Sequence, residues 1–207
     1  MVDIIIVRHG QTRYNKNDSC LVRLDIPMTA AGQIAAGDLS RRMKGIYADI
    51  IYSSPLDRAR NTAGPYLGTH GMVKRTKLVI EPALIERDWG EWECKPLKTI
   101  KKERPEEYAA FMEDWLNYTV PGGESFADVQ ARVDEFLDRI IPENDGKTLY
   151  LSTHLGAARH IISHLLGLAP EKSRLFRMDN ATYTYIEYDN KTRTGIMKCL
   201  SNILVSL

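Results

Sequence analysis

Short β-branched runs alternate with amphipathic helical patterns along most of this chain, and this alternation limits the folds that it can adopt. The first run, VDIIIV at residues 2–7, is almost continuously apolar, as is typical of a strand buried on both faces of a sheet. We therefore predict an α/β fold, a three-layer α/β/α sandwich with a mostly parallel central sheet. The predicted strands are residues 2–7, 48–54, 78–82 and 148–153, and the predicted helices are residues 30–44, 54–65, 126–140 and 155–167.

Capping residues and prolines indicate where these helices begin and end. Thr29 and Ser54 are the expected N-caps of the first two helices, with Pro55 in the first helical position of the second. Pro65 is expected to end or kink the second helix, and residues 142–146, which begin with Pro142 and end with Gly146, to break the third.

The remaining segments add two short helices and a terminal strand pair. Residues 96–118 are polar with Pro105 inside, which predicts two short helices there. Residues 182–188 and 195–204 read as two strands joined by a turn. Since no repeat, linker or low-complexity segment interrupts the chain, we expect a single domain over residues 1–207.

Composition and charge exclude several classes of function. Hydrophobic residues make up 43% of the 207 residues and the net charge is +1, which argues against nucleic-acid or membrane binding driven by bulk charge. Three widely spaced cysteines, Cys20, Cys94 and Cys199, offer no disulfide framework. The N-terminal apolar run is too short for a signal peptide and no stretch is long enough to span a membrane, so we expect a cytoplasmic protein.

Polar residues with chemical potential follow the predicted strands at the points where these end. Arg8 and His9 close the first strand, and Arg58 stands one turn into the helix after the second. Glu86 follows the third strand, and His154 closes the fourth. Because ligands of such folds bind beyond the carboxyl ends of the strands, we expect these five side chains to share one rim of the sheet.

This set of residues suits the transfer of a phosphoryl group. Two guanidinium groups can bind phosphoryl oxygens bidentately, and a neutral imidazole can attack phosphorus. A second imidazole, if protonated, can stabilise charge on the transferring oxygens, while a carboxylic acid protonates the leaving alkoxide and then activates water. Helix N-termini after the first and fourth strands are expected to add backbone N–H donors. The chemistry requires no metal ion or other cofactor.

Each residue also has a plainer interpretation. Arg58 could lie on a solvated helix face, and Glu86 shares its loop with Asp88, Glu91 and Glu93. His160 and His164 are spaced to share one helix face and could hold a metal, but no further ligand motif supports this, so we expect polar or half-buried helix positions.

Six stretches of the chain resemble the signature elements of the histidine phosphatase superfamily, the phosphoglycerate mutase-like group. RHGQTRYN at residues 8–15 is similar to the specific RHGxTxxN signature of that family. The resemblance covers nearly the whole chain. The other stretches are DIPMTAAG at 25–32, SSPLDRARNTA at 53–63, LIERDWGEWE at 84–93, PGGESFADVQARV at 121–133 and STHLGAARHIISHLLGL at 152–168.

The resemblance implies a role for each matching residue. His9 would be the nucleophile that becomes phosphorylated, and Glu86 the proton donor and later the base. Arg8 and Arg58 would hold the phosphoryl oxygens, with His154 beside them. Further substrate contacts would come from Gln11, Asn15 and Leu155, of which Gln11 and Leu155 would act through backbone groups at the pocket edge.

Departures from the family pattern favour a phosphatase that hydrolyses a small phosphomonoester. Leu155 stands where many members have Gly, and Ser19 and Val22 replace the Arg and Gly that mutases use near the substrate. The chain also lacks the longer central insertion of the mutases, and residues 90–120 would form a helical substrate-facing segment. A mutase-type phosphotransferase and a non-catalytic phosphate-binding module are the alternatives. The expected partner is a small phosphorylated molecule, with no nucleic acid or membrane. The terminal strand pair could also form an exposed sheet edge through which a homodimer assembles.

Overall fold

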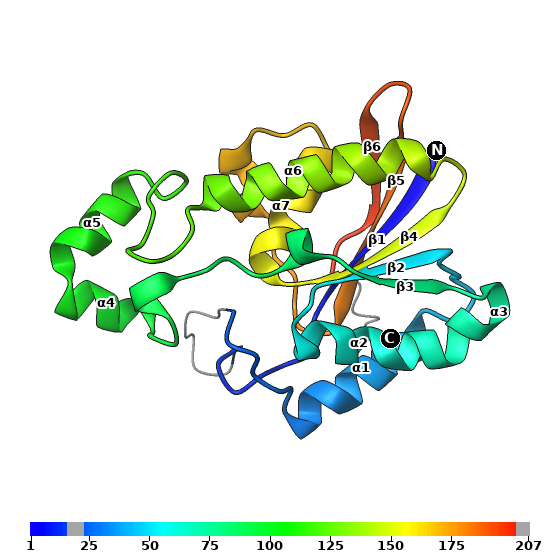
Figure 1. The fold of residues 1–207 in the computed structure, drawn as a ribbon, viewed down its shortest axis with the longest axis horizontal. Coiled ribbons are helices and arrows are strands. Elements are labelled where there is room, and N and C mark those ends of the chain that lie inside the picture. The colour runs from blue at the N-terminus through cyan, green and yellow to red at the C-terminus, as the bar shows by residue number, and fades with distance from the viewer. Residues whose placement is uncertain (16–22, 202–207) are drawn as a thin grey trace.

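The computed structural model describes residues 1–15 and 23–201. A six-stranded sheet forms its centre, with the strand order β3-β2-β4-β1-β5-β6 (Figure 1). Strands β1 to β4 pair in parallel, whereas β5 pairs antiparallel with both β1 and β6. The strands are β1 (Val2–Arg8), β2 (Ile50–Ser53), β3 (Lys77–Ile80), β4 (Thr148–Thr153), β5 (Thr182–Asp189) and β6 (Thr194–Cys199), and the α-helices are α1 (Ala30–Arg42), α2 (Asp57–Tyr66), α3 (Met72–Lys74), α4 (Leu97–Glu103), α5 (Pro105–Glu113), α6 (Phe126–Glu143) and α7 (Leu155–Leu165).

Helices cover both faces of the sheet, which confirms the predicted α/β/α sandwich. Figure 1 shows α6 and α7 on one face and α1 and α2 on the other. One apolar core joins the inner face of α6 and α7 to β1 and β4, and a second core joins α1 and α2 to the opposite face of the same strands. The alternating isoleucines of β1 divide between them, because Ile4 and Ile6 enter the first core and Ile5 the second.

The N-cap of α1 and the end of α6 are predicted correctly, whereas the predicted start of α2 is wrong. The Thr29 side chain caps α1 by accepting a hydrogen bond from Gly32 N at 3.0 Å. Ser54 and Pro55 do not begin α2, which starts two residues later, and the Ser54 hydroxyl accepts from Leu56 N. α6 ends at Glu143, within the predicted break at residues 142–146.

Pro65 lies inside α2 and is followed by a change of helix type. The α-helix ends one residue after the proline, at Tyr66, and residues Leu67–Gly71 continue as a π-helix. The expectation of an end or kink at this proline is therefore confirmed.

Residues 88–124 form an excursion from the sandwich, seen at the left of Figure 1, that contains the two predicted short helices α4 and α5. It has its own apolar cluster around Trp92, Ile100 and Phe111. Hydrogen bonds close the neck of the excursion, from Arg87 Nε to Glu124 O at 2.7 Å and from Glu124 N to the carbonyl oxygen of Asp88 at 2.9 Å. The excursion is thus anchored where it leaves and rejoins the sandwich.

The terminal strand pair is confirmed as β5 and β6, with β6 at one edge of the sheet. Residues 202–204 of the predicted last strand lie outside the described residues, as do Ser19, Cys20 and Val22. Cys94 and Cys199 are free thiols. Among the described residues, no helix combines the length and apolar character that crossing a membrane requires.

Candidate active site

Parallel pairing aligns the carboxyl ends of β1, β2 and β4 at one edge of the sheet. The register places Arg8 beside Thr153 and Ser53 beside Ser152. Backbone hydrogen bonds continue this alignment one residue further, because His9 N donates to Thr153 O at 3.0 Å. The residues that follow the strands are therefore held together, as the sequence predicts.

His9 and His154 form a buried pair at this edge. Their ring centroids lie 5.0 Å apart, and the two side chains are 1% and 0% exposed. His9 Nδ1 lies 2.7 Å from Gly10 O, and a carbonyl oxygen can only accept, so Nδ1 carries the proton and Nε2 holds the lone pair of the neutral ring. His154 Nε2 lies 2.8 Å from Ser54 Oγ, which fixes the second ring.

Burial and neighbouring cations keep both imidazoles neutral. Burial lowers the pKa of His9 well below 6.5, and the charges of Arg58 and Arg8 lower it further. The pKa of His154 is lowered well below 6.5 for the same reasons, burial first and then Arg58. A neutral imidazole with an available lone pair is the form that can act as a nucleophile.

Arg8 and Arg58 supply two positive charges beside this pair. The Arg58 side chain is fully buried and donates from Nη1 to Leu24 O at 3.0 Å, while Arg8 Nη1 donates to Met178 O at 2.5 Å. Burial lowers the pKa of each guanidinium and the charge of Glu86 raises it, yet both stay cationic at neutral pH. Arg58 therefore does not lie on a solvated helix face.

Glu86 is the acidic residue of its loop that lies at this site. Its side chain is 7% exposed, and its carboxylate accepts from Arg87 N at 2.9 Å and from Gly156 N at 3.3 Å. The other acidic residues of the loop are engaged elsewhere. Asp88 pairs with Arg23, Glu91 with Arg104, and Glu93 accepts from Leu24 N.

Two neighbours that sequence reasoning did not single out position Glu86. A Cβ atom on Gly156 would lie 2.3 Å from Glu86 Oε1, so the carboxylate occupies space that only glycine leaves open. Arg132 of α6 donates to Ala83 O and, at 2.8 Å, to Ile85 O, which holds the segment before Glu86. Both residues stand inside family-like stretches of the sequence, Gly156 in residues 152–168 and Arg132 in residues 121–133, so their positions were available as a signal.

The predicted substrate-binding residues Gln11, Asn15 and Leu155 lie around the same edge. Gln11 is tied to Thr29, because its backbone oxygen accepts from Thr29 N at 2.8 Å and its Oε1 accepts from the Thr29 hydroxyl at 3.1 Å. Asn15 Oδ1 accepts from Thr12 N at 2.9 Å, which leaves its NH₂ group on the other side of the amide. Leu155 is the first, half-buried residue of α7.

Two further side chains hold the backbone around His9, and sequence reasoning missed both. Thr62 Oγ1 accepts from Gly10 N at 2.9 Å, and Asn180 Nδ2 donates to His9 O at 2.9 Å. Thr62 belongs to the stretch of sequence that carries Arg58, so its position was available as a signal. Asn180, just before β5, has no comparable motif.

The helices expected after the first and fourth strands both begin near this edge. α7 begins at Leu155 with His154 as its N-cap, so its first backbone N–H groups face this edge, and Gly156 N donates to Glu86. α1, the helix that follows the first strand, begins at Ala30, and its N-cap Thr29 donates from its backbone N to Gln11 O at 2.8 Å.

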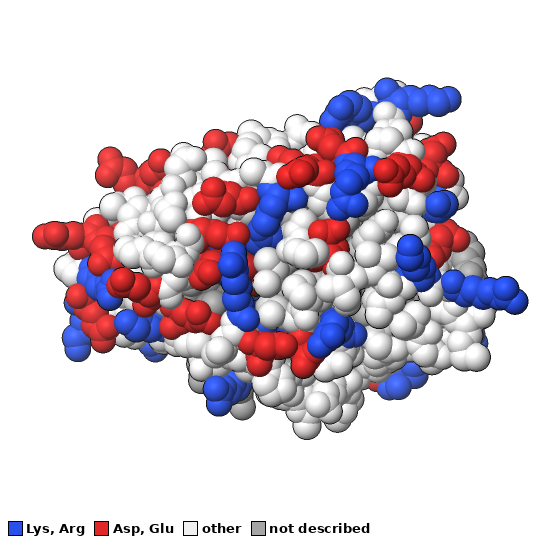
Figure 2. Space-filling model, in the orientation of Figure 1, with Lys and Arg blue, Asp and Glu red and all other residues white. Residues whose placement is uncertain are grey.

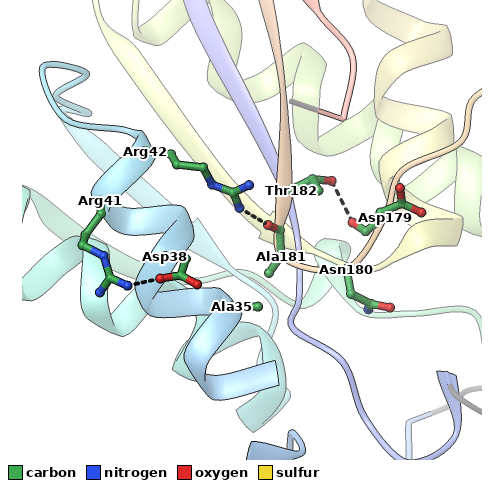
Figure 3. Close-up of a pocket in the computed structure, with 8 residues that line it drawn as sticks. All are labelled: Ala35, Asp38, Arg41, Arg42, Asp179, Asn180, Ala181 and Thr182. Carbon is green, nitrogen blue, oxygen red and sulfur yellow. Dashed lines mark hydrogen bonds and ion pairs between the residues drawn. The ribbon is translucent and has the colours of Figure 1, made fainter. Parts of the chain in front are cut away.

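The surface charge and a hollow beside α1 give no stronger candidate for a functional site. The face in Figure 2 carries acidic and basic side chains intermixed. A hollow of about 700 Å³ lies between α1 and residues 179–182, where Arg41 pairs with Asp38 and Arg42 donates to Ala181 O (Figure 3). Within residues 1–15 and 23–201, no group of three or more His, Cys, Asp or Glu side chains could hold a metal ion.

Known proteins are similar to this chain in sequence and in fold. The pattern of the histidine phosphatase superfamily (branch 1) matches residues 4–197. Adenosylcobalamin/α-ribazole phosphatase of Escherichia coli K12 is 28% identical over 91% of this chain and 91% of its own length. Phosphoserine phosphatase 1 of Hydrogenobacter thermophilus is 29% identical over 96% of this chain and 92% of its own. The α-ribazole phosphatase structure from Shigella flexneri superposes with a TM-score of 0.87 at 25% identity, covering 97% of this chain and 96% of that one. The chain belongs to the histidine phosphatase superfamily.

Proposed function

We propose that this protein is a phosphatase that hydrolyses a small-molecule phosphomonoester through a phosphohistidine on His9. The observation that carries the proposal is the neutral His9 ring, protonated at Nδ1, between two arginine charges. Arg8 and Arg58 bind the phosphoryl oxygens, and Nε2 of His9 attacks phosphorus. His154 hydrogen-bonds the transferring oxygens. None of these steps requires a metal ion.

Glu86 handles the proton in both steps. As the bond from phosphorus to the leaving oxygen breaks, the Glu86 carboxylic acid gives its proton to the leaving alkoxide. The resulting carboxylate then takes a proton from water as this water attacks the phosphohistidine, which releases inorganic phosphate and restores His9. The hydrogen bond of 3.3 Å from Gly156 N to Glu86 Oε2 supports this assignment, because it holds the carboxylate at the start of α7, next to His154.

Asn15, Gln11 and Leu155 complete the proposed pocket. The Asn15 NH₂ group donates to a phosphoryl oxygen, because its Oδ1 is already used by Thr12. Gln11 and Leu155 contribute backbone groups at the pocket edge. The names of the relatives support a small phosphorylated substrate, since they include α-ribazole phosphatase and phosphoserine phosphatase.

A rapid acid or base quench with a ³²P-labelled phosphomonoester tests the proposal. We expect acid-labile, base-stable label on the wild-type protein and none on the His9→Ala variant. Turnover should persist in EDTA. The His70→Gln variant is a matched control, because His70 is a buried histidine far from the site whose Nε2 bonds to Ser40 O, and glutamine can keep that bond. Wild-type turnover by His9→Ala would contradict the proposal.

The same preparation separates the phosphatase from the alternatives. We expect inorganic phosphate to be the main product when 3-phosphoglycerate is supplied. Formation of 2-phosphoglycerate faster than inorganic phosphate would identify a mutase instead. Phosphate binding without any turnover would identify a non-catalytic module.

A further inference from the structure

A further polar pocket, separate from the hollow beside α1, lies between α6 and α7, and none of the residues at the candidate active site lines it. Its volume is about 190 Å³. At roughly 30 Å³ for each water molecule, this space suits a few waters or one small organic molecule. The side chains that define this α6–α7 pocket are Gln130 and Asp134 of α6 and His160, Ser163 and His164 of α7.

Two of these side chains are buried, and neither has a hydrogen-bond partner among residues 1–15 and 23–201. His160 is 2% exposed, and neither Nδ1 nor Nε2 of its ring has a partner. Ser163 is 3% exposed, and its Oγ is likewise without one. Buried polar groups of this kind are nearly always satisfied, so something other than the protein is expected to bond to them.

The other three side chains form a network that ends in a carboxylate. Asp134 Oδ1 accepts from His164 Nδ1 at 2.8 Å, and Asp134 Oδ2 accepts from Gln130 Nε2 at 3.2 Å. Asp134 remains 31% exposed, and it supplies the only carboxylate of the pocket, which no lysine or arginine lines. The charges of Arg132, Arg159 and Arg87 also act on His160, but none of these residues lines the pocket, so Asp134 is the charged group that a ligand contacts there.

The His160 ring and the Ser163 hydroxyl match a ligand that both donates and accepts hydrogen bonds. Burial holds the pKa of His160 at about 4, so its ring is neutral and offers one N–H donor and one lone pair. The Ser163 hydroxyl also donates and accepts. A hydroxyl group on the ligand matches both, whereas a bare ammonium ion or metal ion would leave the imidazole N–H without an acceptor.

We propose that the α6–α7 pocket binds a small amino alcohol. The ammonium group of this ligand lies against Asp134, and its hydroxyl group hydrogen-bonds to His160 and Ser163. The pocket size limits the ligand to a few carbon atoms. This site is separate from the phosphatase chemistry proposed above, and its occupancy can be tested without measuring turnover.

Titration of ¹⁵N-labelled protein with ethanolamine at constant ionic strength tests the proposal, with the imidazole ¹⁵N resonances of His160 as the readout. We expect a saturable shift. Ethylamine lacks the hydroxyl group and so loses its hydrogen bonds to His160 and Ser163, whereas ethanol lacks the ammonium group and so loses its contact with Asp134. Each should bind at least about tenfold more weakly.

Variants separate the two halves of the ligand. Ser163→Ala should weaken ethanolamine about tenfold and leave ethylamine unchanged, whereas Asp134→Asn should weaken both amines. Ser40→Ala is the matched control, since Ser40 is a buried serine on α1 whose Oγ already bonds to Thr69, and it should change neither. Equal shifts with all three probes, no saturation, or an unchanged ethanolamine affinity in Ser163→Ala would each overturn the proposal.

Discussion

The candidate active site and the α6–α7 pocket each contain two histidines, yet they treat them in opposite ways. At the active site both rings are held by the protein, His9 through Gly10 O and His154 through Ser54, and arginine charges surround them. In the pocket one ring, His164, bonds to a carboxylate, and the other, His160, has no partner. The same residue type is therefore oriented for an anion in one place and left open to a hydrogen-bonding cation in the other.

The difference teaches that burial alone does not define a catalytic histidine. Burial lowers the pKa of His9, His154 and His160 alike. The charges of Arg132, Arg159 and Arg87 also act on His160, so the difference is that the first two lie at the strand ends with Arg8 and Arg58. Variants that change the surroundings and keep the histidines should therefore separate the two regions.

The largest effect is expected from Arg58, which makes the active site cationic. Arg58→Lys keeps a charge but loses the planar fork, so we expect kcat/KM for a phosphomonoester to fall by about 10²- to 10³-fold. Arg60→Lys on the same helix is the control, because Arg60 is exposed and pairs with Asp57 at the surface. Steady-state kinetics check both variants, and similar rates for the two would show that Arg58 does not bind the phosphoryl group.

A smaller loss is expected when the space for the acid is filled. Gly156→Ala places a methyl group where Glu86 Oε1 now lies, so the carboxylate must move and we expect kcat to fall about 10- to 100-fold. The loss should be greatest for substrates with poor leaving groups, which need the proton most. Gly64→Ala is the control, since nothing lies within 4 Å of a Cβ there and its helical position should make the variant slightly more stable. A uniform loss across leaving groups would argue against Glu86 as the acid.

The smallest effect on turnover is expected from changes in the α6–α7 pocket. A change at His160 should instead alter how the free energy of unfolding depends on pH. His160 has a pKa of about 4 in the folded protein and 6.5 as an ordinary histidine, so below pH 6.5 the unfolded chain binds more protons. The wild-type free energy of unfolding should therefore fall by up to about 1.4 kcal/mol per pH unit from this residue between pH 6.5 and 4.

His160→Phe removes this contribution, so its stability relative to the wild type should grow as the pH falls through that range. Denaturant unfolding at several pH values measures it. Ser163→Ala keeps the imidazole and should retain the wild-type pH dependence. Parallel curves for His160→Phe and the wild type would show that the ring is not held neutral by burial.

Sequence reasoning could find the active site because its residues stand at the ends of strands, where position along the chain dictates position in space. Arg8, His9 and His154 follow from this rule alone. Glu86 does not, since three other acidic residues share its loop, and only the resemblance to a family selected it. Asn180 acts through a long-range contact to a backbone carbonyl group, which leaves no pattern in the sequence. Arg132 lies in a family-like stretch, but its contact to Ile85 O could be seen only in the fold.

Helix ends were less predictable where a tertiary contact competes with a local preference. Ser54 has the right residue type for an N-cap, but it turns its hydroxyl to His154 and Leu56 instead. The α6–α7 pocket could not be foreseen either. The helical spacing of His160 and His164 places both on one face, but only packing decides that one finds a partner and the other does not.

The closed neck at residues 87, 88 and 124 makes the excursion of α4 and α5 exchangeable. Its two ends are bonded to each other, and Arg132 bonds to Ile85 O, just before Glu86, and pairs with Glu124 at the neck. A related chain can therefore have a longer, shorter or different excursion, and so contact different substrates, while Glu86 keeps its position. The fold separates the inherited reaction from the part of the chain that is free to change.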